Sequence, residues 1–359
     1  MTRYILPVNL DVDMNINCFD YYKLSMILSN KELIPWYIER FIGLQVDQHF
    51  ECSYYELGSS SPTEYEFVFD EVLSTTRIIL GKDTILDATL KALKEKKYVL
   101  LTLNQKYFRE YHKLRNLDSV HGTMFVGYDE ESELLYFLEN VDNKWSLESL
   151  NFSDLEQSFH SSLEIILKDD YVDSWLLFLS RVGEPASTFE VKNNFNRQVR
   201  LNIIYDTLIH YLNGVENISR DSRFYRWNGI AIYKAFYQNL TEILMNNDLH
   251  EYFKPFRIHN IEKGMRRLLE NKRGLIYRAN YLVESLSIEC DETLLKDLRD
   301  LYSLLETGVA LYSKFFRKQD KKIIERANVN LKRAEELECI ILSQLSNSIL
   351  NHIKLNIGH

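Results

Sequence analysis

Cysteine is scarce in this chain, and its few residues are scattered. They lie at Cys18, Cys52, Cys290 and Cys339 of 359 residues, and no two of them form a Cys-x-x-Cys pair. Four isolated thiols are too few for a disulfide framework, and without a paired motif a zinc site of that type is not expected. We therefore predict no metal site, no cofactor, and a reducing cytoplasmic compartment.

The chain also lacks an excess of positive charge and a long apolar run, and we expect no signal peptide. Its 52 acidic and 43 basic residues give a formal net charge of −9, whereas a nucleic-acid footprint is basic and clustered. No window approaches roughly 18 uninterrupted apolar residues, so no transmembrane helix is expected. Residues Met1–Asp13 hold one arginine and an apolar stretch broken by Pro7 and Asn9, unlike a signal peptide. We predict that the chain binds neither nucleic acid nor membrane.

The composition is that of an ordinary globular protein, with length for two domains. The chain is 45% hydrophobic and 26% charged, which suits a sizeable core. Short strand-type runs mark the first half, and helix-period patterns fill the chain from about residue 190. We predict an α+β fold, with one domain over 1–188 and an all-α helical bundle over 189–359, in which residues 195–354 contain no strand. The helices expected in the bundle span roughly 195–213, 224–246, 257–287, 291–317 and 320–354.

Strands and helices are mixed in the first half. Residues 4–12 resemble a short edge strand, because Pro7 cannot donate to a central ladder. Residues 65–80 alternate weakly between a strand pattern and a helix pattern, and we leave them unassigned. The other expected elements are a helix opening at Cys18, a helix starting at Pro35, a helix capped by Asp83, a buried strand over Tyr98–Leu103 and a strand over Trp175–Leu179.

The helix that opens at Cys18 places a thiol at a helix N-terminus. Asn17 is a favoured N-cap residue, and Asp20 can complete a capping-box-like pair. Cys18 would then be the first helical residue, where the helix dipole favours a negative charge and hence a thiolate. The alternative is a small buried apolar residue, which is what most free cysteines are.

A β-hairpin brings a histidine close to an acid or an amide. Two apolar runs, His121–Tyr128 and Leu134–Glu139, flank the polar turn Asp129–Glu133. A turn centred near residue 130 or 131 sets His121 opposite roughly Glu139 to Val141, within side-chain reach. Only one of Glu139 and Asn140 can share a face with His121, and a slip of one residue exchanges them. We predict Glu139, with Asn140 as the alternative.

A cysteine at a helix start, then a histidine, then an acid or amide is the chain order of papain-like enzymes. The imidazole would take the thiol proton, and the third group would hold the imidazole in orientation. An oxyanion hole needs donors beside the nucleophile. The candidates for it are the backbone N–H of Cys18 and the side chain of Asn15 or Asn17. A cysteine at a helix start, a strand histidine and a hairpin carboxylate are each common by themselves. Their order in the chain and the hairpin register together favour the cysteine-enzyme interpretation.

The chain resembles the butirosin biosynthesis protein H N-terminal family, a branch of the papain-like and bacteriocin-peptidase-like cysteine fold. Family members usually carry Asp where this chain has Glu139, and residues 43–60 are poorer in glycine than the family pattern. The helical half is similar to the domain that commonly follows in that family. The residues that carry the resemblance are Asn17-Cys18, Tyr98–Leu103, His121–Asp129, the strand to Glu139, Gly229–Ala235, Arg278–Leu282 and Glu338 in the last helix.

The resemblance implies acyl transfer in natural-product assembly of the antibiotic type. Cys18 would take an acyl or aminoacyl group from the phosphopantetheine thioester of an acyl or peptidyl carrier protein. A small-molecule amine would then accept the group as an amide. Two other classes stay open: a cysteine hydrolase, either thioesterase or peptidase, and a non-catalytic binding or scaffold protein of the same fold. Whether the chain forms a homo-oligomer is also left open.

Overall fold

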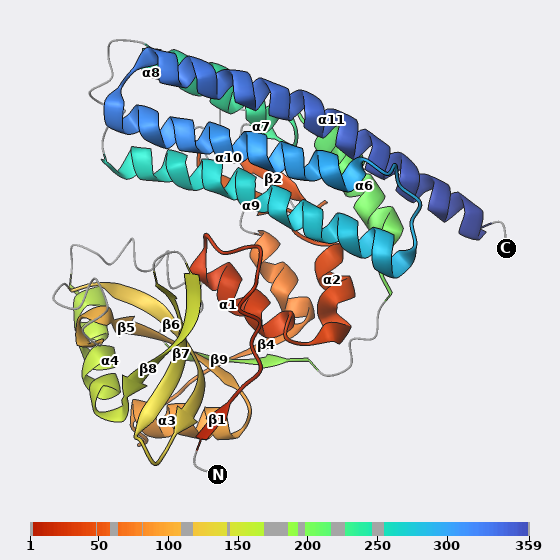
Figure 1. The fold of residues 1–359 in the computed structure, drawn as a ribbon. Coiled ribbons are helices and arrows are strands. Elements are labelled where there is room, and N and C mark those ends of the chain that lie inside the picture. The colour runs from red at the N-terminus through yellow and green to blue at the C-terminus, as the bar shows by residue number, and fades with distance from the viewer. Residues whose placement is uncertain are drawn as a thin grey trace. The chain divides into compact units, whose positions relative to one another are not determined.

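The fold mixes a β-sheet region with a C-terminal helical segment, as the sequence predicts (Figure 1). The computed structural model describes residues 3–47, 49–57, 64–80, 82–108, 118–141, 144–168, 186–192, 198–216, 227–245 and 255–357. The strand expected over Trp175–Leu179 lies outside these residues.

Two compact units make up the chain, and their boundary is not a single cut. The first unit comprises Met1–Val12, Asn17–Ile34 and Glu66–Asn196. The second comprises Asp13–Ile16, Pro35–Tyr65 and Arg197–His359. The single boundary expected between 188 and 189 therefore differs from this division, because two early segments group with the C-terminal helices.

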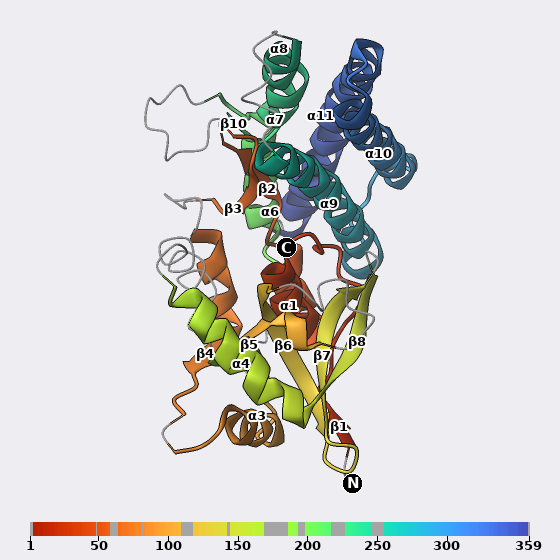
Figure 2. The ribbon, with the colours of Figure 1, turned by 90° about the vertical axis from the view of Figure 1, so that its left-hand side faces the viewer.

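The first unit is built on an antiparallel sheet of seven strands within the described residues, in the order β4-β9-β5-β6-β7-β8, with β1 also on β6. Figure 2 shows β5 to β8 side by side, with α4 lying across β5. The strands are β1 (Arg3–Ile5), β4 (Leu73–Arg77), β5 (Tyr98–Asn104), β6 (Val120–Asp129), β7 (Leu134–Val141), β8 (Lys144–Asn151) and β9 (Ala186–Val191). The buried strand expected from Tyr98 is confirmed, and every residue of β5 is buried.

Helices flank this sheet and the connections to it. They are α1 (Cys18–Ile27), α3 (Ile85–Lys94) and α4 (Phe152–Ile166), with 3₁₀ turns at Lys31–Leu33, Glu64–Glu71 and Gln105–Tyr107. The helix expected from Asp83 begins one residue later, because Thr84 is the cap and its hydroxyl accepts from the Asp87 N–H. The edge strand expected over 4–12 is only β1, and its pairing ends before Pro7.

The β6–β7 hairpin is confirmed, and it contains a bulge. Next to the turn, Asp129 pairs with Leu134, but beyond the bulge Met124 pairs with Leu138. The register shifts by one residue between Phe125 and Gly127. The bulge lies where β1 crosses, and the Val126 carbonyl accepts a hydrogen bond from the Leu6 N–H at 2.7 Å. A side chain at Gly127 would meet the Tyr4 carbonyl oxygen at 2.5 Å, so glycine is required there.

The second unit is mainly helical, and Figure 1 shows its three long helices α9, α10 and α11 running side by side. Its helices are α2 (Ile34–Ile38, with Ile34 grouped in the first unit), α6 (Leu201–Leu212), α7 (Ala231–Lys234), a π-helical turn (Ala235–Leu240), α8 (Thr241–Met245), α9 (Pro255–Leu286), α10 (Leu294–Lys318) and α11 (Lys321–Ile357). Within the described residues each expected helical range contains a helix. The range 224–246 is interrupted by the π-helical turn.

The expectation of a bundle without strands is wrong. β10 (Trp227–Asn228) pairs with β2 (Gly43–Val46), which pairs with β3 (Cys52–Tyr55), in a three-stranded antiparallel sheet. The partner strands come from the early segment Pro35–Tyr65, and a two-residue strand has no period that a sequence pattern can show. The sequence pattern therefore missed β10 because this strand forms only by pairing with β2, which is distant in the sequence.

Buried polar residues of α9 bind the backbone of the two early segments. Both the Asn15 and Ile16 N–H groups donate to Glu270 Oε2, at 2.7 and 2.8 Å. Asn271 Nδ2 donates to the Ile42 carbonyl at 3.0 Å. Arg278 Nη2 donates to the Arg40 carbonyl. Because buried polar groups need partners, these side chains require residues 13–16 and 35–65 beside the helix.

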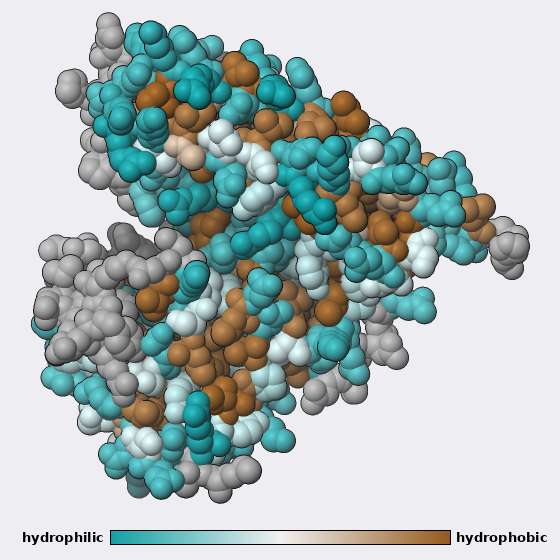
Figure 3. Space-filling view, in the orientation of Figure 1, coloured by the Kyte–Doolittle hydropathy of each residue, from teal (hydrophilic) through white to brown (hydrophobic). Residues whose placement is uncertain are grey.

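The described helices include none that is both long and apolar enough to cross a membrane. Figure 3 shows mainly hydrophilic residues over the exposed sides of the long helices, with scattered hydrophobic ones between them. Among the exposed large hydrophobic residues, Val329, Ile340 and Leu355 lie on α11. Scattered apolar side chains of this kind are normal on a protein surface.

Candidate active site

Cys18 is the first residue of α1, as the sequence predicts. The Asn17 side-chain oxygen accepts from the Phe19 N–H at 3.0 Å, which satisfies one of the amides that the first turn leaves open. The Cys18 side chain is half-buried and forms no disulfide. The thiol therefore sits at the positive end of a ten-residue helix.

His121 meets this thiol from the start of β6. Its Nε2 atom lies 3.3 Å from Cys18 Sγ, within hydrogen-bond distance for sulfur. The strand is fixed on the other side by β5, where His121 pairs with Leu103. Two residues 103 positions apart in sequence are thus brought into direct contact by the helix and the sheet.

The His121 ring is held in its charged form. Burial alone would lower its pKa, but the adjacent Cys18 thiolate and the Glu139 carboxylate outweigh burial and raise the pKa to about 9. The nearby Gly122 backbone also raises the pKa of His121. Within the described part of the chain, Nδ1 makes no hydrogen bond of standard geometry. An imidazolium beside a thiolate is the state that a cysteine nucleophile needs.

Glu139, and not Asn140, lies on the His121 side of the hairpin. Continuing the Met124–Leu138 register sets His121 opposite Val141. Because side chains alternate, Glu139 then shares the face of His121 and Asn140 points to the other. The Glu139 charge acts on the imidazole through space, while its Oε1 accepts from the Asn140 N–H at 3.1 Å. No hydrogen bond joins Glu139 to His121 among the described contacts.

Asn15 and Asn17, the two asparagines considered for an oxyanion hole, each make a hydrogen bond that supports the fold. Asn17 uses its side-chain oxygen to cap α1. Asn15 belongs to the second unit, and its backbone N–H donates to Glu270. The Cys18 N–H remains a candidate, because the first helical residues have no intrahelical acceptor.

Two aromatic residues of α1 that the sequence reasoning passed over pack around the pair. The Tyr22 hydroxyl donates to the Gly122 carbonyl at 3.1 Å. The Phe19 ring lies stacked with the His121 ring, with centroids 6.2 Å apart. A sequence signal existed for Tyr22, because it follows Cys18 by four positions and so falls on the same side of the helix.

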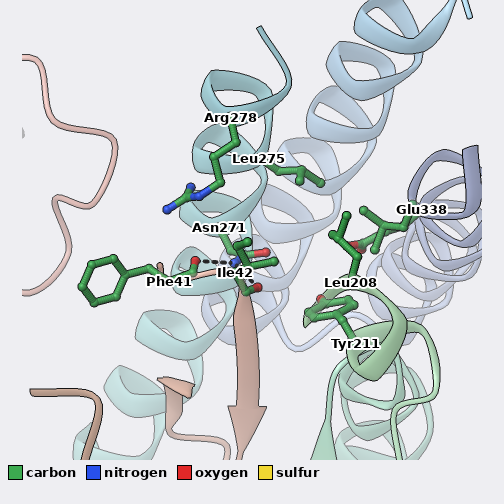
Figure 4. Close-up of a pocket in the computed structure, with 9 residues that line it drawn as sticks. Phe41, Ile42, Leu208, Tyr211, Asn271, Leu275, Arg278 and Glu338 are labelled. Atoms are coloured by element: carbon green, nitrogen blue, oxygen red, sulfur yellow. Dashed lines mark hydrogen bonds between the residues drawn. The ribbon is translucent and has the colours of Figure 1, made fainter. Parts of the chain in front are cut away.

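A separate pocket lies in the second unit, and Glu338, one of the residues that line it, belongs to a buried charged pair (Figure 4). Lys272 and Glu338 are fully buried and hydrogen-bonded to each other. Lys272 also donates to Tyr211 and Asn271, and Tyr233 donates to Glu338. Burial lowers the pKa of Lys272 despite the neighbouring carboxylate. All three Lys272 donors are in use, so the cluster is a closed network. The pocket is lined by Phe41, Ile42, Leu208, Tyr211, Asn271, Leu275, Arg278, Glu338 and Leu342.

Comparisons with known proteins do not identify a relative from which the role of the site could be transferred. No protein-family model matches the chain, and no curated protein matches it in sequence. Within the described residues, no group of three or more His, Cys, Asp or Glu side chains could hold a metal ion. The contact between Cys18 and His121 is thus the strongest chemical feature of the first unit.

Proposed function

We propose that the chain is a cysteine-dependent acyltransferase that moves an acyl or aminoacyl group from a carrier-protein thioester to an amine. The observation that carries the proposal is the 3.3 Å contact between Cys18 Sγ and His121 Nε2 at the N-terminus of α1. The first unit would be a papain-like or bacteriocin-peptidase-like domain. A cysteine at a helix start, followed in the chain by a histidine on an antiparallel strand, supports that assignment.

In the first step the Cys18 thiolate attacks the thioester carbonyl of the donor. A new bond forms between Sγ and the carbonyl carbon, and the bond from that carbon to the phosphopantetheine sulfur breaks. The departing thiolate takes the proton of the His121 imidazolium, which leaves a neutral imidazole beside an acyl-cysteine. The N–H of Cys18 would stabilise the oxyanion between these events.

In the second step an amine attacks the acyl-cysteine. The neutral imidazole of His121 accepts the amine proton, the amide leaves, and the Cys18 thiolate returns beside an imidazolium. The charge of the Cys18 thiolate favours the imidazolium before the first step, and acylation removes that charge, which favours the neutral imidazole that the second step needs. Water in place of the amine would make the same residues a hydrolase.

The test follows acyl transfer to Cys18 directly. Wild-type protein is incubated with a panel of acyl-pantetheine thioesters, and intact-mass spectrometry looks for an acyl adduct. We expect an adduct that maps to Cys18, is absent from Cys18→Ala, persists in Cys290→Ala, and is discharged faster by amines than by water. Cys18→Ala removes one sulfur atom, so it should cost only about 1 kcal/mol of stability.

Three outcomes distinguish the classes. Discharge by water at the same rate with or without amine would replace the transferase by a hydrolase. A Cys18 no more reactive toward iodoacetamide than Cys290 or Cys339 would favour a scaffold protein. Product formation by Cys18→Ala at the wild-type rate would end the cysteine-enzyme proposal.

A further inference from the structure

We propose that Tyr22 is a positioning residue for the Cys18–His121 pair, because its hydroxyl ties the helix that carries the thiol to the strand that carries the imidazole. The inference rests on the proposed function and names a residue that acts through others. Tyr22 itself touches neither Sγ nor Nε2 in a hydrogen bond within the described contacts; its partner is the Gly122 carbonyl.

The tie joins the residues next to both reacting groups. Tyr22 lies one helical turn after Cys18, and Gly122 directly follows His121. The hydrogen bond from the Tyr22 hydroxyl to the Gly122 oxygen is 3.1 Å long and buried. A buried carbonyl without a donor is costly. The bond from Tyr22 therefore fixes the position of β6 along the axis of α1. The Tyr22 ring is 1% exposed, so water cannot readily replace the hydroxyl.

Packing supports the same register from the strand side. An added Cβ at Gly122 would lie 2.6 Å from the Phe19 ring, so the absence of a side chain lets α1 approach β6 closely. The Phe19 ring in turn stacks with His121 at an interplanar angle of 17° and packs edge-on against Tyr22. Phe19, Tyr22 and Gly122 therefore form one contact that sets the separation of the pair.

The His121 ring needs such support. Its Nδ1 atom makes no hydrogen bond of standard geometry within the described residues, although third-group hydrogen bonds commonly hold a catalytic imidazole. The orientation of the ring must then come from packing and from the neighbouring Gly122 backbone, which also raises the pKa of His121. Tyr22 supplies the only hydrogen bond between a side chain of α1 and the Gly122 backbone among those described.

A matched control lies one residue away on the same helix. Tyr21 also donates its hydroxyl to a backbone carbonyl, that of Leu10, at 3.0 Å, and its ring stacks on Trp145. Tyr21→Phe and Tyr22→Phe thus each remove one hydroxyl and one bond of nearly equal length. Only the second bond reaches a residue adjacent to His121. The readouts are the rate of Cys18 alkylation by iodoacetamide between pH 5 and 10 and the NMR titration of the His121 ring.

We expect Tyr22→Phe to slow alkylation at pH 7 about fivefold, the scale of one hydrogen bond, and to move the His121 titration to lower pH. In Tyr21→Phe the alkylation rate should stay within about twofold of the wild-type rate, while the melting temperature should fall by about as much as in Tyr22→Phe. Equal pH profiles for the two variants would overturn the inference.

A second variant keeps the inference testable should Tyr22→Phe not fold. In Gly122→Ala the added Cβ pushes on the Phe19 ring, so this variant should slow alkylation and shift the His121 titration in the same direction. A Gly122→Ala protein with wild-type profiles would also overturn the inference. If wild-type Cys18 reacts no faster than Cys290 and His121 titrates at an ordinary pH, the proposed function has failed, independently of Tyr22.

Discussion

The charge on His121 results from a competition between burial and two neighbouring groups. Burial removes water from the imidazolium and disfavours it, whereas the Cys18 thiolate and the Glu139 carboxylate favour it. The balance raises the pKa of His121 to about 9, so the charged ring is the form present at neutral pH. Folding therefore favours the imidazolium. This contribution to stability is complete below an unfolded pKa of about 6.5 and is lost as the pH rises through about 9.

Removing the thiol should reverse that balance. In Cys18→Ala the largest group that favours the imidazolium is gone while burial remains, so the His121 titration midpoint should fall by more than about one unit from its wild-type value. The measurement is an NMR titration of the ring proton signals, with Cys290→Ala as the control that removes a distant thiol. An unchanged midpoint in Cys18→Ala would mean that the two side chains are not in contact in solution.

Glu139 and Asn140 can be separated by substitution. Glu139→Gln removes the charge on the His121 side, so we expect kcat/KM to fall about tenfold, the equivalent of one pKa unit. Asn140→Ala alters the opposite face and should leave kcat/KM within about twofold. The assay is amine-dependent product formation with whichever thioester labels Cys18. The reverse pattern would show that the strand register differs by one residue.

At the scale of elements, the bulge in the β6–β7 hairpin decides which of these residues faces the histidine. The sequence predicts the two strands and their polar turn, and both are confirmed. It leaves the register open, because the turn lacks an Asn-Gly or Asp-Gly pair. Without the bulge, the pairing beside the turn would continue to place Asn140 on the His121 side. The bulge is supported by β1, some 120 residues earlier, and no local pattern reports such a contact.

The cap of α1 offers a test at the same scale. Asn17→Ala leaves the Phe19 N–H without its acceptor, so we expect a loss of about 1 kcal/mol of stability together with slower alkylation of Cys18. Asn30→Ala is the matched control, because Asn30 accepts from the Glu32 N–H at 3.1 Å in the next turn of chain. Denaturant unfolding and iodoacetamide kinetics measure both effects. Equal alkylation rates in the two variants would show that the Asn17 cap does not affect the reactivity of Cys18.

At the scale of the whole molecule, the division of the chain into two units does not follow its sequence order. Periodicity predicts the long helices α9, α10 and α11, and they are present. It does not predict that residues 13–16 and 35–65 group with them. Charged residues along a helix are usually read as its solvated face, yet Glu270 and Arg278 of α9 are 4% and 3% exposed. Such residues find their partners only in the folded chain.

From the two units we expect that the helical bundle, residues 189–359, does not fold as an independent domain. A fragment of residues 189–359 keeps every long helix and the Arg267–Glu270 ion pair, but it loses the early-segment partners of Glu270, Asn271 and Arg278. Each buried polar group left unpaired costs about 1–3 kcal/mol, and more when it is charged. The sum approaches the total stability of a typical domain, about 5–15 kcal/mol. We expect the fragment to be helical by circular dichroism but to unfold without a cooperative transition.

A second fragment restores the missing partners and separates this explanation from mere truncation. Residues 35–65 joined by a glycine-serine linker to residues 197–359 regain the acceptors of Asn271 and Arg278, together with β2 and β3 for β10. That fusion should unfold cooperatively in urea. Glu270 keeps Arg267 and regains the Tyr54 hydroxyl as partners, so Glu270→Gln should lower the stability of the fusion by leaving the buried Arg267 charge unpaired. Cooperative unfolding of residues 189–359 alone would show instead that helix packing suffices and that the buried polar side chains of α9 tolerate the loss of the early segments.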